Sequence, residues 1–306
     1  MITVIIPILN AMPYLPEALN SLESQSFRDF EVCLWDNGST DGSVEEARRW
    51  IPGRLKGRVV TGKSLPLHEC LARMVDEAQT EFVARMDGDD VCLPERFRLQ
   101  TNFFLENPEV ALLGGQIRCI SPSGDFLSQD EWARYALTHS DIVSRMMVLG
   151  PFNHPSIMFR RGAVMAAGNY RVPAPVEDHN LYLKLVQNNR VANLPEVLTY
   201  YRIHAASICA SACKNGLHNQ LALESTARES LRIFGIDSNA FSKMRQKKHP
   251  LVALPLARSA LWRAKRENTP VFRILKSQAF TYSSRCMIAD NDILSRVFFR
   301  IVDAQK

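Results

Sequence analysis

Two groups of acidic residues lie about ninety positions apart in this 306-residue chain. The first, Asp87-Gly88-Asp89-Asp90, follows the strand-like segment 82–86, and the second, Glu177-Asp178, opens an amphipathic segment. Carboxylates are costly to bury, so a cluster directly behind an apolar strand indicates a function. Asp-x-Asp at a strand end can hold a hard divalent cation, and a separate carboxylate can act as a base on a hydroxyl. Such a combination suits a sugar-nucleotide-dependent transferase.

The composition is that of an ordinary globular protein, with 46% hydrophobic and 23% charged residues. No apolar run approaches the roughly 18 uncharged residues of a membrane span, and the apolar N-terminus lacks the basic region of a signal peptide. The seven cysteines include no Cys-x-x-Cys pair, and their odd number prevents complete pairing within the chain. We therefore expect reduced thiols and a cytoplasmic protein.

Charge is unevenly distributed along the chain. Residues 214–306 contain 17 lysines and arginines against 7 acidic residues, a net charge of +10, whereas residues 1–213 carry −5. A basic segment behind a mildly acidic domain indicates an anionic partner, either a membrane surface or a nucleic acid. No recognition motif supports a nucleic acid, so we expect none. Basic residues beside apolar ones favour peripheral docking on anionic lipid; alternatively, the apolar residues pack on the domain and the cations are solvated.

The first half of the chain alternates between strand-like and helix-like segments. Strands are predicted at 2–9, 30–35, 59–60 and 82–86, and helices at 15–22, 44–50 and 67–78. This alternation predicts an open, largely parallel α/β sheet, in which ligands gather beyond the carboxyl ends of the strands. Asn10, Asp36-Asn37 and Asp87–Asp89 all follow predicted strand ends, so they should converge on one crevice.

The second half is predicted to add further elements and then to become helical. Helices are expected at 95–105, 141–149, 161–167 and 177–188, and strands at 156–159 and 198–202, with a strand pair or a bend at 110–119. From about residue 215 strand signals fade, and helices are predicted at 217–234, 251–266 and 270–289. The expected organisation is a domain over 1–213 and a basic helical C-terminal extension over 214–306.

A set of short motifs carries a resemblance to a known family over about residues 1–210. They are Val4-Ile5-Ile6-Pro7-Ile8-Leu9-Asn10, Ser24-Gln25-Ser26-Phe27, Asp36-Asn37-Gly38-Ser39-Thr40-Asp41-Gly42-Ser43, Ala84-Arg85-Met86-Asp87-Gly88-Asp89-Asp90, Leu93-Pro94-Glu95-Arg96-Phe97, His154-Pro155-Ser156-Ile157-Met158-Phe159-Arg160-Arg161, Glu177-Asp178 and Tyr201-Arg202-Ile203-His204. Each motif alone is weak, but in this order and spacing the set resembles family 2 glycosyltransferases with the GT-A fold.

The resemblance implies a fold and an activity. The fold would be a nucleotide-binding open mixed sheet with helices on both faces, followed here by the helical extension. The activity would be metal-dependent transfer of a hexosyl or N-acetylhexosaminyl group from a nucleotide sugar, expected to be a UDP-sugar, with inversion at the anomeric carbon. The implied acceptor is a hydroxyl of a cell-envelope glycan or a lipid-linked molecule, in polysaccharide or lipopolysaccharide biosynthesis.

Residues at the strand ends would hold the nucleotide, as the resemblance implies. These are Pro7, Asn10, Asp36, Asn37 and Asp87, the last facing the ribose. Side-chain oxygens suit a base such as uracil, which offers an N–H donor; alternatively, the segment at 36–39 is only a turn. The chain departs from the family pattern at three positions: Asn37 replaces an aspartate common in uridine-binding members, Leu9 an aromatic residue, and Ala72 an asparagine.

The resemblance also assigns the metal site. Asp89, with Asp87, would ligate Mg²⁺ or Mn²⁺, which neutralises charge on the leaving diphosphate. Gly88 would let the phosphate approach the backbone. His204 completes the metal site in some family members, although a lone histidine is more often structural. His154 would line the acceptor side or serve a structural role. For Arg85, a substrate contact and pairing with a carboxylate are both open.

By the same resemblance, Asp178 would be the general base that deprotonates the acceptor hydroxyl, and Glu177 would position the acceptor or the base. The alternative is that both are N-terminal helix charges favoured by the helix dipole. Two other functions are weighed against the transferase. A nucleotidyltransferase would need a glycine- and lysine- or arginine-rich loop after the first strand, and residues 7–12 contain none. A catalytically inactive sugar-nucleotide-binding module would not need the complete set of Asp87, Asp89 and Asp178.

Overall fold

The computed structural model describes residues 1–127, 135–146, 150–171 and 177–207. The chain divides into two compact units, residues 1–142 with 150–226 and residues 143–149 with 227–306. All described strands belong to the first unit. The predicted C-terminal extension 214–306, with its three helices, lies outside the described residues, as do residues 208–213 of the predicted domain.

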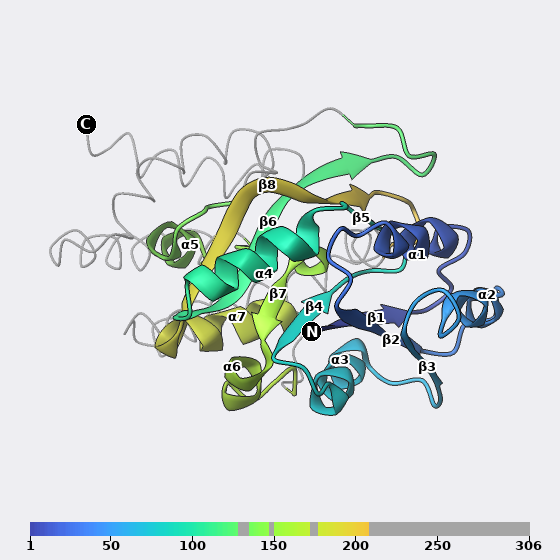
Figure 1. Ribbon diagram of the computed structural model, residues 1–306, viewed down its shortest axis with the longest axis horizontal. Coiled ribbons are helices and arrows are strands. Elements are labelled where there is room, and N and C mark those ends of the chain that lie inside the picture. The colour runs from blue at the N-terminus through green and yellow to red at the C-terminus, as the bar shows by residue number, and fades with distance from the viewer. Residues whose placement is uncertain (128–134, 147–149, 172–176, 208–306) are drawn as a thin grey trace, which may run out of the picture. The chain divides into compact units, whose positions relative to one another are not determined.

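The first unit is built on one eight-stranded sheet with the order β3-β2-β1-β4-β7-β6-β8-β5 (Figure 1). Its strands are β1 (Ile2–Ile8), β2 (Phe30–Asp36), β3 (Gly57–Thr61), β4 (Phe82–Arg85), β5 (Val91–Cys92), β6 (Val110–Ile120), β7 (Met158–Arg160) and β8 (Arg190–Arg202). The strands β3, β2, β1 and β4 run parallel, and so do β6 and β8. The strand β7 is antiparallel to β4 and β6, and β5 is antiparallel to β8. The described sheet is therefore mixed, because β7 and β5 run opposite to the other strands.

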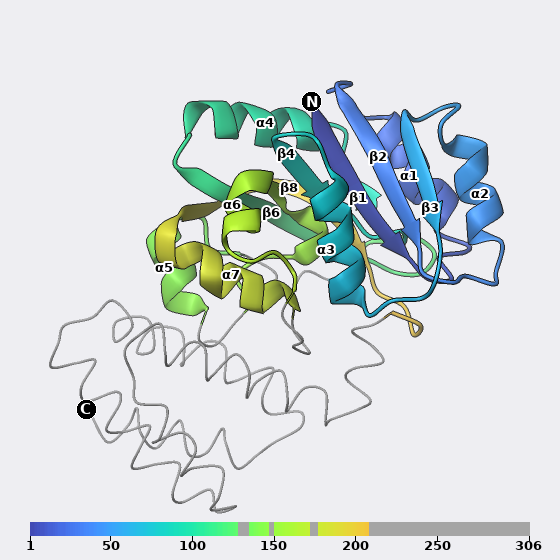
Figure 2. The same cartoon turned by 90° about the horizontal axis from the view of Figure 1, so that it is seen from below.

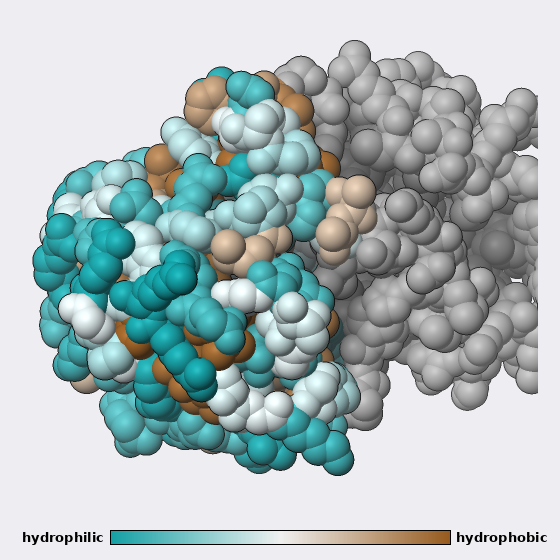
Figure 3. Space-filling view, turned by 90° about the vertical axis from the view of Figure 1, so that its right-hand side faces the viewer, coloured by the Kyte–Doolittle hydropathy of each residue, from teal (hydrophilic) through white to brown (hydrophobic). Residues whose placement is uncertain are grey.

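Helices cover both faces of the sheet, as expected. The helices are α1 (Leu15–Glu23), α2 (Ser43–Trp50), α3 (Leu67–Glu77), α4 (Arg96–Glu106), α5 (His139–Arg145), α6 (Arg161–Ala166) and α7 (Glu177–Asn188). Figures 1 and 2 show α3, α6 and α7 on one face, and α1, α2 and α4 on the other. Figure 3 shows that the side of the molecule carrying α2 and β3 is mostly hydrophilic.

Local sequence patterns explain why these segments fold as they do. The strand β1 is central, and its side chains are buried on both faces except for the half-buried Pro7, which matches an apolar run without alternation. The helix α1 buries Leu15, Ala18, Leu19 and Leu22, the i, i+3, i+4, i+7 positions of a helix that packs one face on a core. Six predicted helices agree with the structure to within one residue at each end. The helix predicted at 141–149 begins two residues earlier, and its described part ends at Arg145.

Three predicted segments differ from the structure for physical reasons. The sequence predicted either a strand pair or a bend at 110–119. Residues 110–120 form one strand, whose pairing with β8 shifts in register near Gly114 and Gln116. The strand β8 begins at Arg190, eight residues before the predicted start, because pairing with β6 keeps residues 190–197 extended. Pro195 is accommodated there because it lies opposite the shift between the Gly114 and Gln116 pairs. Ser156, predicted as strand, ends a short 3-10 helix (His154–Ser156) before β7.

Arg96 is a buried connector beneath the site. Its side chain is fully buried, and its guanidinium donates to the carbonyl oxygens of Pro155 at 2.8 Å, Arg85 at 2.8 Å and Ile157 at 3.0 Å. Its Nε donates to Gln100 Oε1 at 3.1 Å. These bonds join α4 to the end of β4 and to the residues before β7, so Arg96 fixes the position at which the acidic loop, Asp87–Asp90, begins.

We predict that Arg96→Met lowers the free energy of unfolding by about 3 kcal/mol or more, because several buried acceptors lose their donor at once. Urea denaturation measures this loss. Arg98→Met on the same helix is the control, since Arg98 is exposed and forms an ion pair with Glu95 one turn away; its change should stay below about 0.5 kcal/mol. Equal effects of the two substitutions would contradict the role given to Arg96.

Candidate active site

The polar segments predicted to converge do lie at one edge of the sheet. Parallel pairing places Ile8 opposite Asp36, and Ile5 opposite Arg85, so β1, β2 and β4 end at the same edge. The segments that follow these ends contain Asn10, Asn37 and the acidic loop. The neighbouring segments are bonded directly, since Asn37 N donates to Ile8 O at 2.8 Å.

The loops after β1 and β2 are joined by side-chain hydrogen bonds. Asn10 has a positive φ of 53°; its backbone N–H donates to Ser39 Oγ at 2.8 Å, and its Oδ1 accepts from Thr40 N at 2.9 Å. Asp41 and Ser43 add bonds of 2.9 Å each to the backbone N–H groups of Met12 and Ala11. The sequence analysis assigned no role to the side chains of Asp41 and Ser43. Their position in a turn-like motif was the only signal.

Asp36 and Asn37 also bond within the chain. The carboxylate of the buried Asp36 accepts from Gly38 N at 3.0 Å and from Ser39 N at 3.1 Å. Asn37 donates from Nδ2 to Leu65 O and accepts at Oδ1 from Leu65 N, both at 2.8 Å. The half-buried Pro7 lies in β1 opposite Trp35. Of the predicted nucleotide-binding side chains on these loops, Asn10, Asp36 and Asn37 therefore shape the backbone that would face a ligand.

The acidic loop brings three carboxylates together. Oxygen atoms of Asp87, Asp89 and Asp90 lie within 4.8 Å of one another. Asp90 is buried; its Oδ1 accepts from Arg202 N at 2.9 Å, whereas its Oδ2 is buried with no hydrogen-bond partner among the described residues. Burial and the neighbouring carboxylates raise the pKa of Asp90 well above its usual range. Burial, opposed by Arg85, raises the pKa of Asp87 to about 6.

His204 joins this group. Its Nε2 lies 2.8 Å from Asp89 Oδ2, and its ring packs against Tyr14 with centroids 4.8 Å apart. The structure thus places His204 beside the acidic loop, as expected from its motif. Hard carboxylate oxygens, one of them buried without a partner, and an imidazole nitrogen form a donor set that fits a divalent cation. Asp90, to which the sequence analysis assigned no role, belongs to this cluster by position.

Two neighbours of the carboxylates have roles that the sequence left open. Arg85 is buried and forms an ion pair of 2.6 Å with Asp87, which favours carboxylate pairing over a substrate contact. Gly88 is buried, and a Cβ added there would lie 2.8 Å from Ile8 Cγ2 and 3.2 Å from Ala11 Cβ. The requirement for glycine therefore comes from close packing on β1 and the loop after it.

The second acidic pair forms the first turn of α7. Glu177 and Asp178 are both half-buried, and Asp178 Oδ1 accepts from His179 N at 2.6 Å. Burial, and next the charge of Asp178, raise the pKa of Glu177; Asp87 raises it further and Arg85 lowers it. Glu177 is therefore close enough to Asp87 and Arg85 for their charges to act on it. The charges of the two acidic groups therefore act on one another, although the groups are ninety residues apart in sequence.

His154 lies apart from the metal-like cluster. It is buried, its Nε2 lies 2.9 Å from Tyr170 Oη, and its ring also lies near that of Tyr182. Burial, with a smaller effect of Arg85, lowers the pKa of His154 well below its usual range, so its imidazole is neutral at pH 7. The structural or acceptor-side role expected from its motif stays a prediction.

None of the helices in the described part of the chain is both long and apolar enough to cross a membrane.

A family-wide sequence comparison matches this chain. The model described as Glycosyl transferase family 2 matches residues 3–166. The amylovoran biosynthesis glycosyltransferase AmsE of Erwinia amylovora is 34% identical over 190 residues, which are 61% of this chain and 70% of the relative. The O-antigen biosynthesis glycosyltransferase WbnJ of Escherichia coli is 28% identical over 238 residues, which are 76% and 89% of the two chains.

Solved structures share the fold. TarS 1–349 of S. aureus in complex with UDP-GlcNAc has a TM-score of 0.58 at 18% identity, and the match covers 99% of this chain and 91% of TarS. The mannosyltransferase PcManGT of Pyrobaculum calidifontis, in complex with GDP-Man and Mn²⁺, also has a TM-score of 0.58, at 16% identity, with 98% and 85% covered. At these identities the likeness concerns the arrangement of the elements.

We predict that Asn37→Asp, although it introduces the acid expected from the family resemblance, lowers the free energy of unfolding by about 1–3 kcal/mol. A carboxylate can accept from Leu65 N but cannot donate to Leu65 O, which would lose its partner. Asn20→Asp on the exposed face of α1 makes the same chemical change and should have little effect. Denaturant melts at pH 7 compare the two; equal stabilities of wild type and Asn37→Asp would contradict the structural role.

Proposed function

Because the chain belongs to glycosyl transferase family 2 and is a glycosyltransferase with the GT-A fold, we propose that it is an inverting, divalent-metal-dependent enzyme. It transfers a sugar from a nucleotide sugar to a hydroxyl group of a cell-envelope glycan or a lipid-linked acceptor. The observation that carries this proposal is the cluster of Asp87, Asp89 and Asp90 at the edge of the sheet, together with a second acidic group, Glu177-Asp178, whose Glu177 is near enough for the charge of Asp87 to act on it. One group suits the diphosphate side of a donor, and the other suits an acceptor hydroxyl.

In the proposed reaction Asp178 is the general base. Its carboxylate removes the proton of the acceptor hydroxyl as the hydroxyl oxygen forms a bond to the anomeric carbon. The bond between this carbon and the diphosphate oxygen breaks on the opposite side, and the nucleoside diphosphate leaves with the electron pair. This single displacement inverts the anomeric centre. Glu177, beside Asp178 in the first turn of α7, orients the base or the acceptor.

In this proposal the acidic loop lies next to the diphosphate of the donor. Asp89, Asp87 and His204 would hold Mg²⁺ or Mn²⁺, which when bound supplies positive charge to a leaving diphosphate. Asp87 also faces the ribose in this proposal, and Arg85 keeps its carboxylate ionised and oriented through their ion pair. Backbone groups of the joined loops after β1 and β2, shaped by Asn10, Asp36 and Asn37 beside Pro7, contact the base. His154 lines the acceptor side through its pairing with Tyr170.

The donor proposed is a UDP-sugar carrying a hexosyl or N-acetylhexosaminyl group. TarS, which shares the fold, was solved with UDP-GlcNAc, and PcManGT was solved with GDP-Man, so GDP-sugars form the natural comparison in any test. The relatives AmsE and WbnJ are named for amylovoran and O-antigen biosynthesis. Their names support a role in making a surface polysaccharide or lipopolysaccharide.

A lipid-linked acceptor would give the basic C-terminal segment a use. We propose that 214–306 is a separate helical extension whose net charge of +10 attracts it to anionic lipid at the inner face of the plasma membrane. The enzyme would then be cytoplasmic and peripherally bound. No nucleic-acid partner is proposed.

We predict that Asp89→Ala abolishes the Mn²⁺-dependent binding of a nucleoside diphosphate and leaves the fold intact, because Asp89 is half-buried and lies among like charges. A thermal-shift panel of UDP-, GDP- and dTDP-sugars, each with and without Mn²⁺, identifies the nucleotide and measures the loss, since ligand binding to the native state raises the melting temperature. Glu106→Ala, an exposed carboxylate on α4, is the control. An unchanged Mn²⁺-dependent shift in Asp89→Ala would refute the metal assignment.

We predict that Asp178→Asn retains donor binding and lowers kcat by roughly 10²–10⁴-fold, the usual contribution of a general base. The measurement is nucleoside diphosphate release in the presence of an accepted acceptor. Asp141→Asn removes a first-turn carboxylate from another helix, α5, and controls for loss of helix-dipole stabilisation. A near wild-type rate for Asp178→Asn would transfer the role of base to Glu177. A wild-type protein that binds donors but transfers to no acceptor would favour the inactive binding module.

A further inference from the structure

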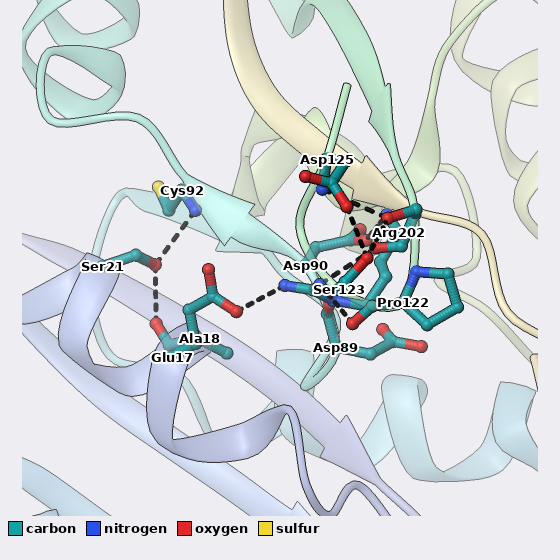
Figure 4. A network of polar contacts seen from close by, with 11 residues as sticks. Glu17, Ala18, Ser21, Asp89, Asp90, Cys92, Pro122, Ser123, Asp125 and Arg202 are labelled. Carbon is teal, nitrogen blue, oxygen red and sulfur yellow. Dashed lines mark hydrogen bonds and ion pairs between the residues drawn. The ribbon is translucent and has the colours of Figure 1, made fainter. Parts of the chain in front are cut away.

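Arg202 is a buried cation with an unusually complete set of partners. Its side chain is 1% exposed, yet it carries a full positive charge, which is costly to bury unless the charge is paired and hydrogen-bonded. Its Nε donates to Asp89 O at 2.8 Å, and its Nη1 donates to Ser121 O and Pro122 O, both at 3.2 Å. Its Nη2 donates to Glu17 Oε2 at 2.5 Å. Figure 4 shows these bonds converging on one guanidinium.

The acceptors come from three segments that are distant in sequence. Glu17 belongs to α1, Asp89 to the acidic loop, and Ser121-Pro122 to the turn after β6. The turn is held by its own bonds, with Ser121 N donating to Asp125 O at 2.8 Å and Asp125 N to Ser121 Oγ at 3.1 Å. These bonds within the turn hold its carbonyl oxygens in place without the help of Arg202. Arg202 closes a ring of contacts around the acidic loop.

Residues of α1 and just after it also hold the segment that follows the acidic loop, at β5 (Val91–Cys92). Ser21 Oγ accepts from Cys92 N at 3.0 Å, and Gln25 Nε2 donates to Leu93 O at 2.8 Å. Tyr14 packs against both Arg202 and His204, with 4.8 Å from the ring centroid to the guanidinium carbon and 4.8 Å between ring centroids. The loop is thus clamped between α1 and the end of β8.

These contacts act on the residues that would hold the cation. Arg202 binds the main chain of Asp89 through its side chain and Asp90 Oδ1 through its own backbone N–H. His204 follows Arg202 by two residues and contacts Asp89 Oδ2. A change in the position of Arg202 would therefore displace the Asp89 carboxylate and the His204 imidazole together. The planar guanidinium spreads its donors over three nitrogens and so reaches acceptors in different directions, whereas the three donors of a lysine share one nitrogen.

We propose that Arg202, anchored by Glu17, is a positioning residue that sets the geometry of the divalent-cation site. The inference rests on the proposed function, because it takes Asp89 and His204 as cation ligands. Glu17 is the partner that can be changed without disturbing the core, since its side chain is 54% exposed and contacts the guanidinium through its carboxylate. Asp89 and His204 retain all of their own atoms in such a variant, so any loss of cation affinity would arise from their arrangement.

The decisive variant is Glu17→Gln in the full-length protein, compared with Glu23→Gln. Glu23 lies on the same helix and forms an ion pair of 2.5 Å with Arg54, away from the acidic loop. Binding of Mn²⁺ is measured by the loss of the free-ion electron paramagnetic resonance signal, with UDP or GDP present, whichever stabilises the wild type more. Glu17→Gln should weaken Mn²⁺ binding about three- to tenfold, while Glu23→Gln binds as the wild type does. Nucleotide binding without Mn²⁺ should be equal in all three proteins.

Arg202→Lys provides the second arm. It should weaken Mn²⁺ binding at least as much as Glu17→Gln does. In the double variant the Mn²⁺ affinity should fall by less than the product of the two single factors, because both substitutions disturb the same placement of the side chain at position 202. Unchanged Mn²⁺ affinity in Glu17→Gln would overturn the inference while leaving the metal assignment intact. A wild type that binds no Mn²⁺ would overturn both. Equal weakening in Glu17→Gln and Glu23→Gln would also overturn the inference, because it would reveal a general effect of charge on α1.

Discussion

The cost of holding like charges together away from bulk water governs the structure of this site. Asp87, Asp89 and Asp90 gather directly beyond a buried strand, and burial raises the pKa of Asp87 and Asp90. The ion pair with Arg85 offsets part of the cost at Asp87, and the backbone N–H of Arg202 offsets part of it at Asp90. Carboxylates that are held together away from water favour a bound cation, because a divalent ion relieves their mutual repulsion. The free-energy cost of removing them from water is already met by the folded protein.

Two buried guanidinium groups hold the framework against that repulsion. Arg96 binds carbonyl oxygens at the end of β4 and before β7, and Arg202 binds those of the acidic loop and the turn after β6. Each joins segments that no single helix or strand connects. The N–H groups of both guanidinium groups donate to backbone carbonyl oxygens of these segments. The buried charges are thereby hydrogen-bonded, and the bonds fix the relative positions of the segments. The acidic loop lies between them, and its position is set from both sides.

The sequence predicted more of the fold than of the side-chain roles. Hydrophobic spacing located the helices because their buried faces repeat every three to four residues. It could not give the direction of β7, which is three residues long, or the full extent of β8, whose first half is extended only because β6 pairs with it. The motif order placed Asp87, Asp89 and His204 in one cluster. It could not show that Asn37 bonds Leu65, or that Arg96 and Arg202 are buried, because an arginine in an amphipathic segment usually indicates a solvated position.

The two ends of the sheet affect how the protein behaves at high concentration. In the described part of the chain the outermost strands are β3, with five residues, and β5, with two. An outer strand exposes backbone groups to which a strand of another molecule can add, and the risk grows with its length and apolar character. At β3 the exposed Arg58 pairs with Glu77, which places charge along the open edge. The shortness of both outer strands, and the charge on β3, disfavour edge-to-edge aggregation of folded molecules.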